Sequence, residues 1–470
     1  MSEQVLEEYY VGPVKVNIVK KSSQCLYIVE EPKLSSFEEK AKDKILSELY
    51  YTKVDNIEEE IVKRLQSFKF PDESIEKVLY HMKKSLLYGE LTILMLDPKV
   101  EEIEYKGYLY PLTVIHRDRS ECIRLYTNIH IQTEEEAIKT IERLANKANK
   151  SINIAKPFLE FSLPEGHRVA ATISKEISLP GSTFDIRKFP LKPLSIVEII
   201  KSGMINELTA SYLWLLIEYK PFIIILGATG SGKTTLLNAL LNLINPNYKI
   251  LTIEDTPEIN IKNQNWVRFV SRATLSGNFD ITMMDLAKLS LRYRPDYLVI
   301  GEVRGKEIEA LVHASASGHG SITTFHGSRP TDAATRITDL LSNDLAKLFL
   351  QTVWAFVVVG NVKEGNNSRR SVLSIYEVVT SKSKVGFKRV IEWSYMKTRF
   401  TPTTVEELIK KSSLLRKLKE TYNVDLQSEL NRRIKFLQEL QNSKVIGFEE
   451  VSQKVLEFYD TGGKVEMANM

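Results

Sequence analysis

Apolar residues in the second half of the chain fall into short continuous runs separated by longer stretches with a helical pattern. Four of these runs predict buried strands, over 222–226, 250–253, 297–301 and 321–325. Two longer stretches predict helices, over 195–202 and 208–220. Three later apolar runs predict a β extension, over 353–359, 371–379 and 387–393. Continuous apolar strands that alternate with helices are typical of a parallel sheet covered on both faces, so we predict an α/β fold here.

The first part of the chain has a more mixed pattern. Charged, amphipathic stretches predict helices over 38–51, 57–67, 74–88 and 134–147. Short runs with strand character predict strands over 100–105, 108–116, 167–172 and 183–187. Thr133 is a suitable N-cap for the last of the helices, because Glu136 follows three residues later. We therefore predict a mixed α+β domain ahead of the α/β domain.

Two prolines separate these patterns. Pro190 and Pro193 each disfavour helix at the preceding residue, so we place the domain boundary there and expect a linker about which the domains can swing. The predicted domains are an N-terminal α+β domain over 1–190, divisible into a helical part over 1–90 and a PAS-like part over 91–190, an α/β domain over 191–400 and a helical extension over 401–470.

The composition is that of an ordinary globular protein, with 43% hydrophobic and 26% charged residues. A formal net charge of +4 is too small to indicate a nucleic-acid partner. No apolar run approaches the roughly 18 residues of a membrane span, and the N-terminus lacks the pattern of a signal peptide. Cys25 and Cys122 lie far apart in the sequence, which argues against a disulfide scaffold and fits a reducing cytoplasm.

One loop carries the strongest chemical signal. It follows the 222–226 strand, precedes a helical run over 234–243 and fits the pattern G-x-x-x-x-G-K-[ST]. Its residues are Gly227, Ala228, Thr229, Gly230, Ser231, Gly232, Lys233, Thr234 and Thr235. Glycines let backbone N–H groups turn toward phosphate oxygens, and the helix N-terminus adds partial positive charge. Lys233 can reach the β- and γ-phosphates and the Thr234 hydroxyl can ligate Mg²⁺, so the loop predicts binding of ATP with Mg²⁺.

Acidic residues follow two of the other predicted strands. A carboxylate at the carboxyl end of a strand lies where open α/β sheets bind ligands. Glu254, Asp255 and Glu258 follow the 250–253 strand, and these acids can serve Mg²⁺ through water or polarise an attacking water. The 297–301 strand ends in Gly-Glu where Asp is usual, so Glu302 is expected to hold Mg²⁺ through water while Glu258 polarises water. The assignment between the two glutamates stays open.

Two histidines flank the 321–325 strand. His319 and His326 make a poor zinc site, because no cysteine is nearby and the spacing matches no common pattern. They can sense the γ-phosphate and relay its loss to a neighbouring element. A purely structural role for each histidine is the alternative.

These motifs, in this order, resemble the secretion-type ATPases that drive type II secretion, type IV pilus assembly and retraction, archaellum rotation and DNA conjugation. The matching segments are G-A-T-G-S-G-K-T-T, T-I-E-D-T-P-E-I, R-P-D-Y-L-V-I-G-E-V-R-G and S-G-H-G-S-I-T-T-F-H, within a region from about 151 to 360. The resemblance implies a RecA-like P-loop ATPase fold with a parallel central sheet. It also implies that Glu258 is the catalytic glutamate, Glu302 the Walker B glutamate, and His319 with His326 the His-box pair.

The N-terminal part resembles the archaeal branch of this family, on the segments L-D-P-K-V-E-E-I at 96–103 and V-I-H-R at 114–117. Segments around Arg168 and Arg187 look like the one that presents arginines to bound nucleotide. The resemblance therefore implies these two as charge-stabilising arginines, with ordinary salt bridging as the alternative. It further implies a homohexamer, a polytopic membrane platform protein as partner, a place at the inner face of the cell membrane, and no structural zinc.

We therefore expect an ATP-hydrolysing motor for an archaeal type IV pilus-like filament. A conjugation-type DNA-export ATPase and an archaellum motor are the alternatives, and the direction of the stroke stays open. Basic residues such as Lys188 and Lys201 are scattered and form no aromatic-interleaved channel, so no nucleic-acid partner is expected. A non-catalytic scaffold is disfavoured because Lys233, Glu258 and Glu302 are all present.

Overall fold

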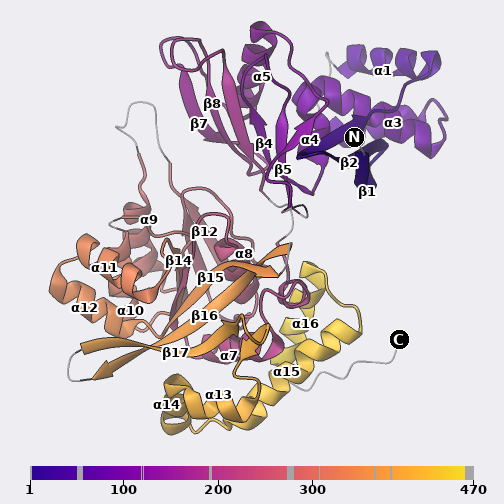
Figure 1. Cartoon of the computed structure of the whole chain (residues 1–470). Helices are drawn as coiled ribbons and strands as arrows, with labels where there is room; N and C mark the ends of the chain where they lie inside the picture. Colours follow the sequence, from indigo (N-terminus) through magenta and orange to yellow (C-terminus); the bar gives the residue numbers. More distant parts are fainter. Residues whose placement is uncertain are drawn as a thin grey trace. The chain divides into compact units, whose positions relative to one another are not determined.

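The computed structural model describes residues 3–49, 57–117, 119, 121–189, 193–272, 280–305, 307–364, 367–381 and 384–460. The chain divides into two compact units, Met1–Leu191 and Lys192–Met470, each with its own hydrophobic core (Figure 1). Pro190, one of the two prolines expected in the linker, lies outside the described residues.

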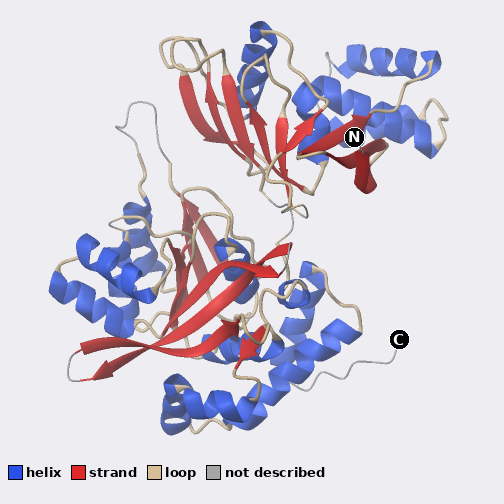
Figure 2. Ribbon diagram, viewed as in Figure 1, coloured by secondary structure: helices blue, strands red, loops and turns tan. Residues whose placement is uncertain are grey.

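The first unit is built on a nine-stranded sheet in the order β1-β2-β3-β6-β5-β4-β9-β8-β7 (Figure 2). The strands are β1 (Glu3–Val11), β2 (Val14–Lys21), β3 (Gln24–Glu30), β4 (Val100–Tyr105), β5 (Thr113–His116), β6 (Leu125–Thr127), β7 (Phe158–Ser162), β8 (Arg168–Thr172) and β9 (Thr183–Arg187). The helices are α1 (Ser36–Leu49), α2 (Ile57–Gln66), α3 (Asp72–Lys83), η1 (Lys84–Tyr88), η2 (Gly89–Leu91), α4 (Thr92–Leu96) and α5 (Glu134–Lys147).

Two local signals in this unit led to different outcomes. Helix α5 begins as predicted, because the Thr133 side chain accepts a hydrogen bond from the Glu136 amide. The expectation of a helical part over 1–90 is wrong for residues 3–30, which form strands β1, β2 and β3. Buried Val14, Val16 and Ile18 alternate there with polar residues, which is the period-two pattern of a half-buried strand.

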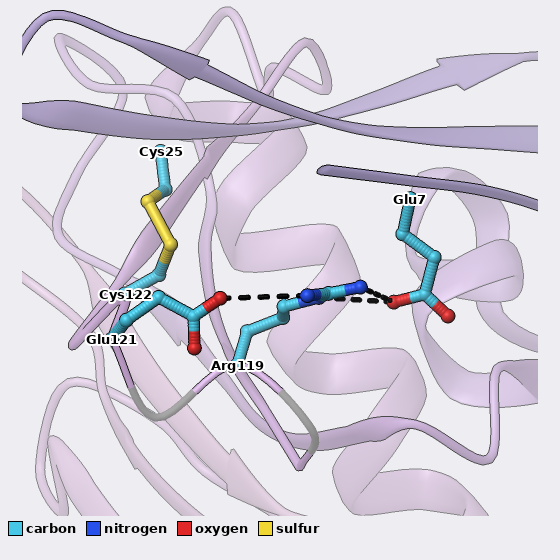
Figure 3. Close-up of a disulfide and its surroundings, with 5 residues drawn as sticks. All are labelled: Glu7, Cys25, Arg119, Glu121 and Cys122. Atoms are coloured by element: carbon cyan, nitrogen blue, oxygen red, sulfur yellow. Dashed lines mark hydrogen bonds and ion pairs between the residues drawn. A yellow bond between two sulfur atoms is a disulfide. The ribbon is translucent and has the colours of Figure 1, made fainter. Parts of the chain in front are cut away.

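Cys25 and Cys122 form a disulfide, with their Cα atoms 5.9 Å apart (Figure 3). The two cysteines pair although their separation in the sequence argued against a disulfide scaffold. Strand β3 pairs in parallel with β6 so that Cys25 lies opposite Leu125, which brings the segment just before β6 beside β3. Close to the disulfide, Arg119 forms ion pairs with Glu7 of β1 and with Glu121 (Figure 3). The disulfide thus ties the N-terminal hairpins to the loop that leads into β6.

We predict that reducing this disulfide lowers the stability of the first unit. A cross-link that closes about 100 residues stabilises a fold by roughly 4.7 kcal/mol in the chain-entropy account, and the separation here is 97 residues. Thermal unfolding of the purified protein with and without reductant, with thiols counted after unfolding, measures the effect. Cys25→Ser should unfold at the lower temperature in both conditions. Identical unfolding of the oxidised and reduced wild-type protein would contradict the prediction.

Parallel strands form the centre of the second unit. They are β10 (Phe222–Leu226), β11 (Ile250–Glu254), β12 (Trp266–Val270), β13 (Tyr297–Ile300), β14 (Ser321–Phe325) and β15 (Ala355–Glu364). Strand β10 lies between β14 and β15, and β11 lies between β12 and β13, all in parallel. The Leu298 amide donates to Gly320 O and the Val303 amide to Thr324 O, which joins β13 to β14. The four predicted strands are confirmed, and every residue of β10, β11, β13 and β14 is buried.

Helices and an antiparallel extension surround these strands (Figures 1 and 2). The helices up to residue 352 are α6 (Ile196–Lys201), α7 (Glu207–Ile217), α8 (Lys233–Leu241), α9 (Met283–Ser290), η3 (Leu291–Tyr293), α10 (Ile308–Ala316), α11 (Pro330–Leu340) and α12 (Asn343–Thr352). The predicted β extension is confirmed: β15 continues antiparallel into β16 (Asn367–Ser381), β17 (Lys384–Ser394) and β18 (Arg399–Thr401). The unit is an α/β fold with a parallel central sheet, as predicted.

The last part of the chain is helical, as predicted, and belongs to the same core. Its helices are α13 (Val405–Lys411), α14 (Ser413–Tyr422), α15 (Leu426–Asn442) and α16 (Phe448–Asp460). A fully buried carboxylate, Glu377 of β16, accepts hydrogen bonds from the Ser413 and Leu414 amides at the start of α14 and from the Tyr212 hydroxyl. None of the helices in the described part of the chain has the length and apolar character that a bilayer crossing needs.

Candidate active site

The loop between β10 and α8 is shaped by its glycines. Gly230 and Gly232 have φ angles of 74° and 96°, in the region that L side chains rarely adopt. Gly227 is required for a different reason. A Cβ there would lie 2.4 Å from Ser231 Oγ and 2.7 Å from Val359 O. The loop is therefore closed on itself and against β15, as the glycine pattern predicts for a phosphate cradle.

Lys233, the first residue of α8, directs its ammonium back into the loop. Its Nζ donates to the carbonyl oxygens of Gly227 at 3.0 Å and Ala228 at 2.9 Å, and the residue is only 8% exposed. Ser231 Oγ donates to the same Ala228 oxygen at 2.7 Å. A buried ammonium at a helix N-terminus interacts strongly with a phosphate anion, because the surroundings screen the charge poorly.

A cavity of about 210 Å³ opens beside this loop. It is lined by Gly227, Ala228, Thr229 and Ser231 of the loop, by Gly327 and Ser328 after β14, by Val358, Val359, Gly360 and Asn361 of β15, and by Leu373 of β16. The start of the phosphate loop and the turn after His326 therefore face the same space.

Glu302, Arg304 and His326 form a polar cluster at the carboxyl ends of β13 and β14. Arg304 Nε donates to Glu302 Oε2 at 2.8 Å, while the other carboxylate oxygen lies against His326 Nε2. Burial, together with the positive charge of Lys233, lowers the pKa of His326, so the ring is neutral near pH 7. The structure thus brings Glu302 and His326 to the edge of the sheet where Lys233 lies. Asp255 joins them at 3.4 Å from Arg304 Nη1.

Glu258 reaches this edge by a route that the sequence did not indicate. Strand β11 is not a neighbour of β10, because β13 and β14 lie between them. The chain after β11 instead returns to helix α8, where Asn238 Nδ2 donates to Glu258 O at 3.0 Å. Helix α8 therefore carries both the phosphate loop and the anchor of Glu258.

Glu254 has a different environment from the other acids of its segment. It is 2% exposed, and its Oε1 accepts the backbone amides of Glu258 at 2.6 Å and Ile259 at 2.7 Å. Burial raises the pKa of Glu254 to about 7. From the sequence, Glu254 was grouped with Asp255 and Glu258. The anchoring role of Asn238 was missed, although a polar residue among the buried positions of α8 was a signal that could have indicated it.

His319 lies at the opposite end of β14 from His326. The five residues of β14 separate the two histidines, which at roughly 3.3 Å per residue places them more than about 13 Å apart. His319 Nδ1 is 3.1 Å from Ala314 O. The structure therefore brings His326, but not His319, to the phosphate loop of this chain.

The two candidate arginines belong to the first unit. Arg168 of β8 and Arg187 of β9 lie directly opposite each other in register, and Arg187 Nε is 4.0 Å from Glu102 Oε1. Like charges directly opposite on neighbouring strands destabilise a sheet. The structure thus places the two candidate arginines side by side on one sheet.

An arginine that sequence reasoning missed packs against the loop. A Cβ on Gly232 would lie 3.4 Å from Arg370 Cδ, so the stem of this side chain covers the last glycine of the motif. The neighbouring Arg369 is turned away, with its guanidinium 4.4 Å from the centre of the Trp393 ring. Only the pairing of β16 with β15 brings this segment to the loop, and the sequence alone does not reveal that pairing.

A family model described as "Type II/IV secretion system protein" matches residues 110–389. The chain belongs to this family. The uncharacterized protein MJ0900 of Methanocaldococcus jannaschii is 30% identical over 502 aligned positions, which cover 97% of this chain and 89% of that protein. The conjugal transfer protein TrbB of Rhizobium radiobacter is 28% identical over 236 positions, 49% of this chain and 71% of that protein.

Among solved structures, the Legionella pneumophila ATPase DotB aligns with a TM-score of 0.46 at 18% identity, over 78% of this chain and 92% of that one. The family match confirms the resemblance to secretion-type ATPases that the motifs indicated. This protein is accordingly an ATPase, an enzyme whose substrate is a nucleotide.

Proposed function

We propose that this protein is the ATP-hydrolysing motor of an archaeal type IV pilus-like filament and acts on a polytopic membrane platform protein. One observation carries the proposal: Lys233, Glu302 and His326 meet at one edge of the sheet, and Glu258 is anchored to the same helix as Lys233. The relative that matches along most of this chain comes from an archaeon, which supports the archaeal assignment.

In the proposed reaction, the loop amides and Lys233 bind the β- and γ-phosphates. Glu258 accepts a proton from a water molecule, whose oxygen attacks the γ-phosphorus. The bond from that phosphorus to the β–γ bridging oxygen breaks, and ADP and phosphate result. His326, which is neutral and touches Glu302, is placed to respond when the γ-phosphate leaves.

The residues present fit Mg²⁺. The Thr234 hydroxyl follows Lys233 at the start of α8, and one carboxylate oxygen of Glu302 is buried against the His326 ring. Both ligands are hard oxygens, which Mg²⁺ prefers together with water and phosphate oxygens. Thr234 and, through water, Glu302 would hold the ion, which when bound neutralises charge on the phosphates.

The working form that we propose is a homohexamer at the inner face of the cell membrane. Arg168 and Arg187 would contact bound nucleotide in that assembly and lose the contact when the γ-phosphate departs. The two like charges, directly opposite each other on β8 and β9, support this role.

A conjugation-type DNA-export ATPase is the second candidate, favoured by the similarity to the conjugal transfer protein TrbB. The two functions differ in what stimulates hydrolysis. We expect the turnover of the purified protein to rise several-fold with the platform protein in lipid vesicles and to stay unchanged with DNA. Stimulation by DNA that falls steeply with salt, and none by the platform protein, would contradict the pilus assignment.

A further inference from the structure

The segment from Glu258 to Lys262 has no assigned helix or strand and pairs with no strand in the described part of the chain. Side chains supply the partners of its backbone instead. Besides the Glu258 and Ile259 amides on Glu254, the Asn260 amide donates to Asn238 Oδ1 at 2.9 Å and the Lys262 amide to Asn242 Oδ1 at 3.0 Å. Side chains from the end of β11 and from the α8 region thus hold the segment along its length.

Asn238 of α8 and Asn242, the C-cap of that helix, lie one turn apart on the same face. Each side chain binds one acceptor and one donor of the segment, because Asn238 Nδ2 also donates to Glu258 O at 3.0 Å and Asn242 Nδ2 to Asn260 O at 3.3 Å. The two amides therefore act as a neighbouring strand would, with bonds at every second residue.

The register of this segment is fixed by its apolar residues. Ile259 is fully buried and Ile261 is 5% exposed, and both belong to the core that includes α8. Burial alternates along the segment, and Glu258, Asn260 and Lys262 are each more exposed than the two isoleucines, so Glu258 lies outside that core. A shift by one residue would bury Glu258 and expose an isoleucine, which makes the observed register strongly preferred.

Glu254 closes the other end of the segment. Its second oxygen accepts from Arg268 Nε at 3.3 Å, so both carboxylate oxygens are engaged. A Cβ at Gly301 would lie 3.1 Å from Glu254 Cγ. The Glu254 side chain thus occupies the space next to the end of β13, which explains why glycine stands where an aspartate is usual.

We propose that Glu254, Asn238 and Asn242 are positioning residues for ATP hydrolysis. The two asparagines fasten the Glu258 segment to the helix that carries Lys233 and Thr234, and Glu254 fastens it to the end of β11. The phosphate loop and the water-polarising carboxylate then move as one rigid body. This inference rests on the proposed role of Glu258. A displacement of about 1 Å between reacting groups can cost on the order of 100-fold in rate, so the anchors matter without touching substrate.

The test compares Glu254→Ala, Glu254→Gln and Asn242→Ala with the exposed control Asn247→Ala. Glutamine keeps an oxygen that can accept the two amides, whereas alanine does not. We expect Glu254→Ala to lower kcat by on the order of 100-fold with little change in the KM for ATP. Glu254→Gln should recover most of the turnover, and Asn242→Ala, at the far end of the segment, should show a smaller loss.

Hydrogen exchange gives an independent readout. The Glu258 and Ile259 amides should exchange faster in Glu254→Ala, while the amides of the phosphate loop keep their wild-type rates. Wild-type kcat in folded Glu254→Ala and Asn242→Ala would overturn the inference, as would an equal loss in Glu254→Gln and Glu254→Ala. If Glu258→Gln itself turns over normally, the proposed role of Glu258 fails instead, so the two failures are distinguishable.

Discussion

Replacing Glu258 with glutamine is expected to slow ATP hydrolysis by about 10²- to 10⁴-fold while ATP still binds, because an amide cannot accept the proton of the attacking water. The substitution should leave the fold intact. The structure holds this residue through its backbone, whose amide bonds to Glu254 and whose carbonyl bonds to Asn238. Steady-state turnover and the affinity for a fluorescent ATP analogue measure the two effects separately.

The matched control is Glu420→Gln, an exposed glutamate on α14. It should hydrolyse ATP at the wild-type rate. Full activity of Glu258→Gln would show that another group polarises water, and Glu302 would then be the first to examine. A loss of ATP binding by a folded Glu258→Gln protein would also contradict the assignment, since the carboxylate is given no part in holding the phosphates.

Lys233→Ala should have the second large effect, on binding as well as on turnover. Losing a charged hydrogen-bond donor costs about 1.5–3 kcal/mol, so we expect ATP to bind about 10- to 100-fold more weakly and hydrolysis to fall to background. The alanine also leaves the Gly227 and Ala228 carbonyls without the ammonium that they bind. Isothermal titration with a non-hydrolysable ATP analogue, together with a turnover assay, measures both losses.

Thermal unfolding of Lys233→Ala separates a lost contact from a collapsed loop. Lys347→Ala, on the exposed side of α12, is the matched control and should bind and hydrolyse ATP as the wild type does. If folded Lys233→Ala hydrolysed ATP normally, the loop would not be the phosphate site.

The central strands of the second unit could be predicted because their residues are buried on both faces. A short, uninterrupted apolar run such as Phe222–Leu226 is typical of a strand that is buried on both faces of a parallel sheet. The start of α5 could also be predicted, because the N-cap Thr133 and its partner Glu136 are only three residues apart in the sequence. The chemistry of the phosphate loop followed for the same reason, because its glycines, Lys233 and Thr234 are contiguous.

Features that depend on pairing between distant segments could not be predicted from the sequence. The disulfide exists because β3 runs beside β6, and no local pattern near Cys25 or Cys122 indicates that neighbour. Arg370 covers Gly232 only because β16 folds back along β15. The two histidines looked like a pair in sequence, yet β14 lies between them and holds them at its opposite ends. The roles of Arg168 and Arg187 stay predictions, as do the domain limits.

The central claim is that the phosphate loop and Glu258 form one hydrolytic pocket. A crystal structure with a non-hydrolysable ATP analogue and Mg²⁺ tests it most directly. We predict that Lys233 Nζ exchanges the Gly227 and Ala228 oxygens for phosphate oxygens, and that the Glu258 carboxylate reaches a water beside the γ-phosphate. An analogue bound away from the loop, or a γ-phosphate that Glu258 does not approach, would contradict the account.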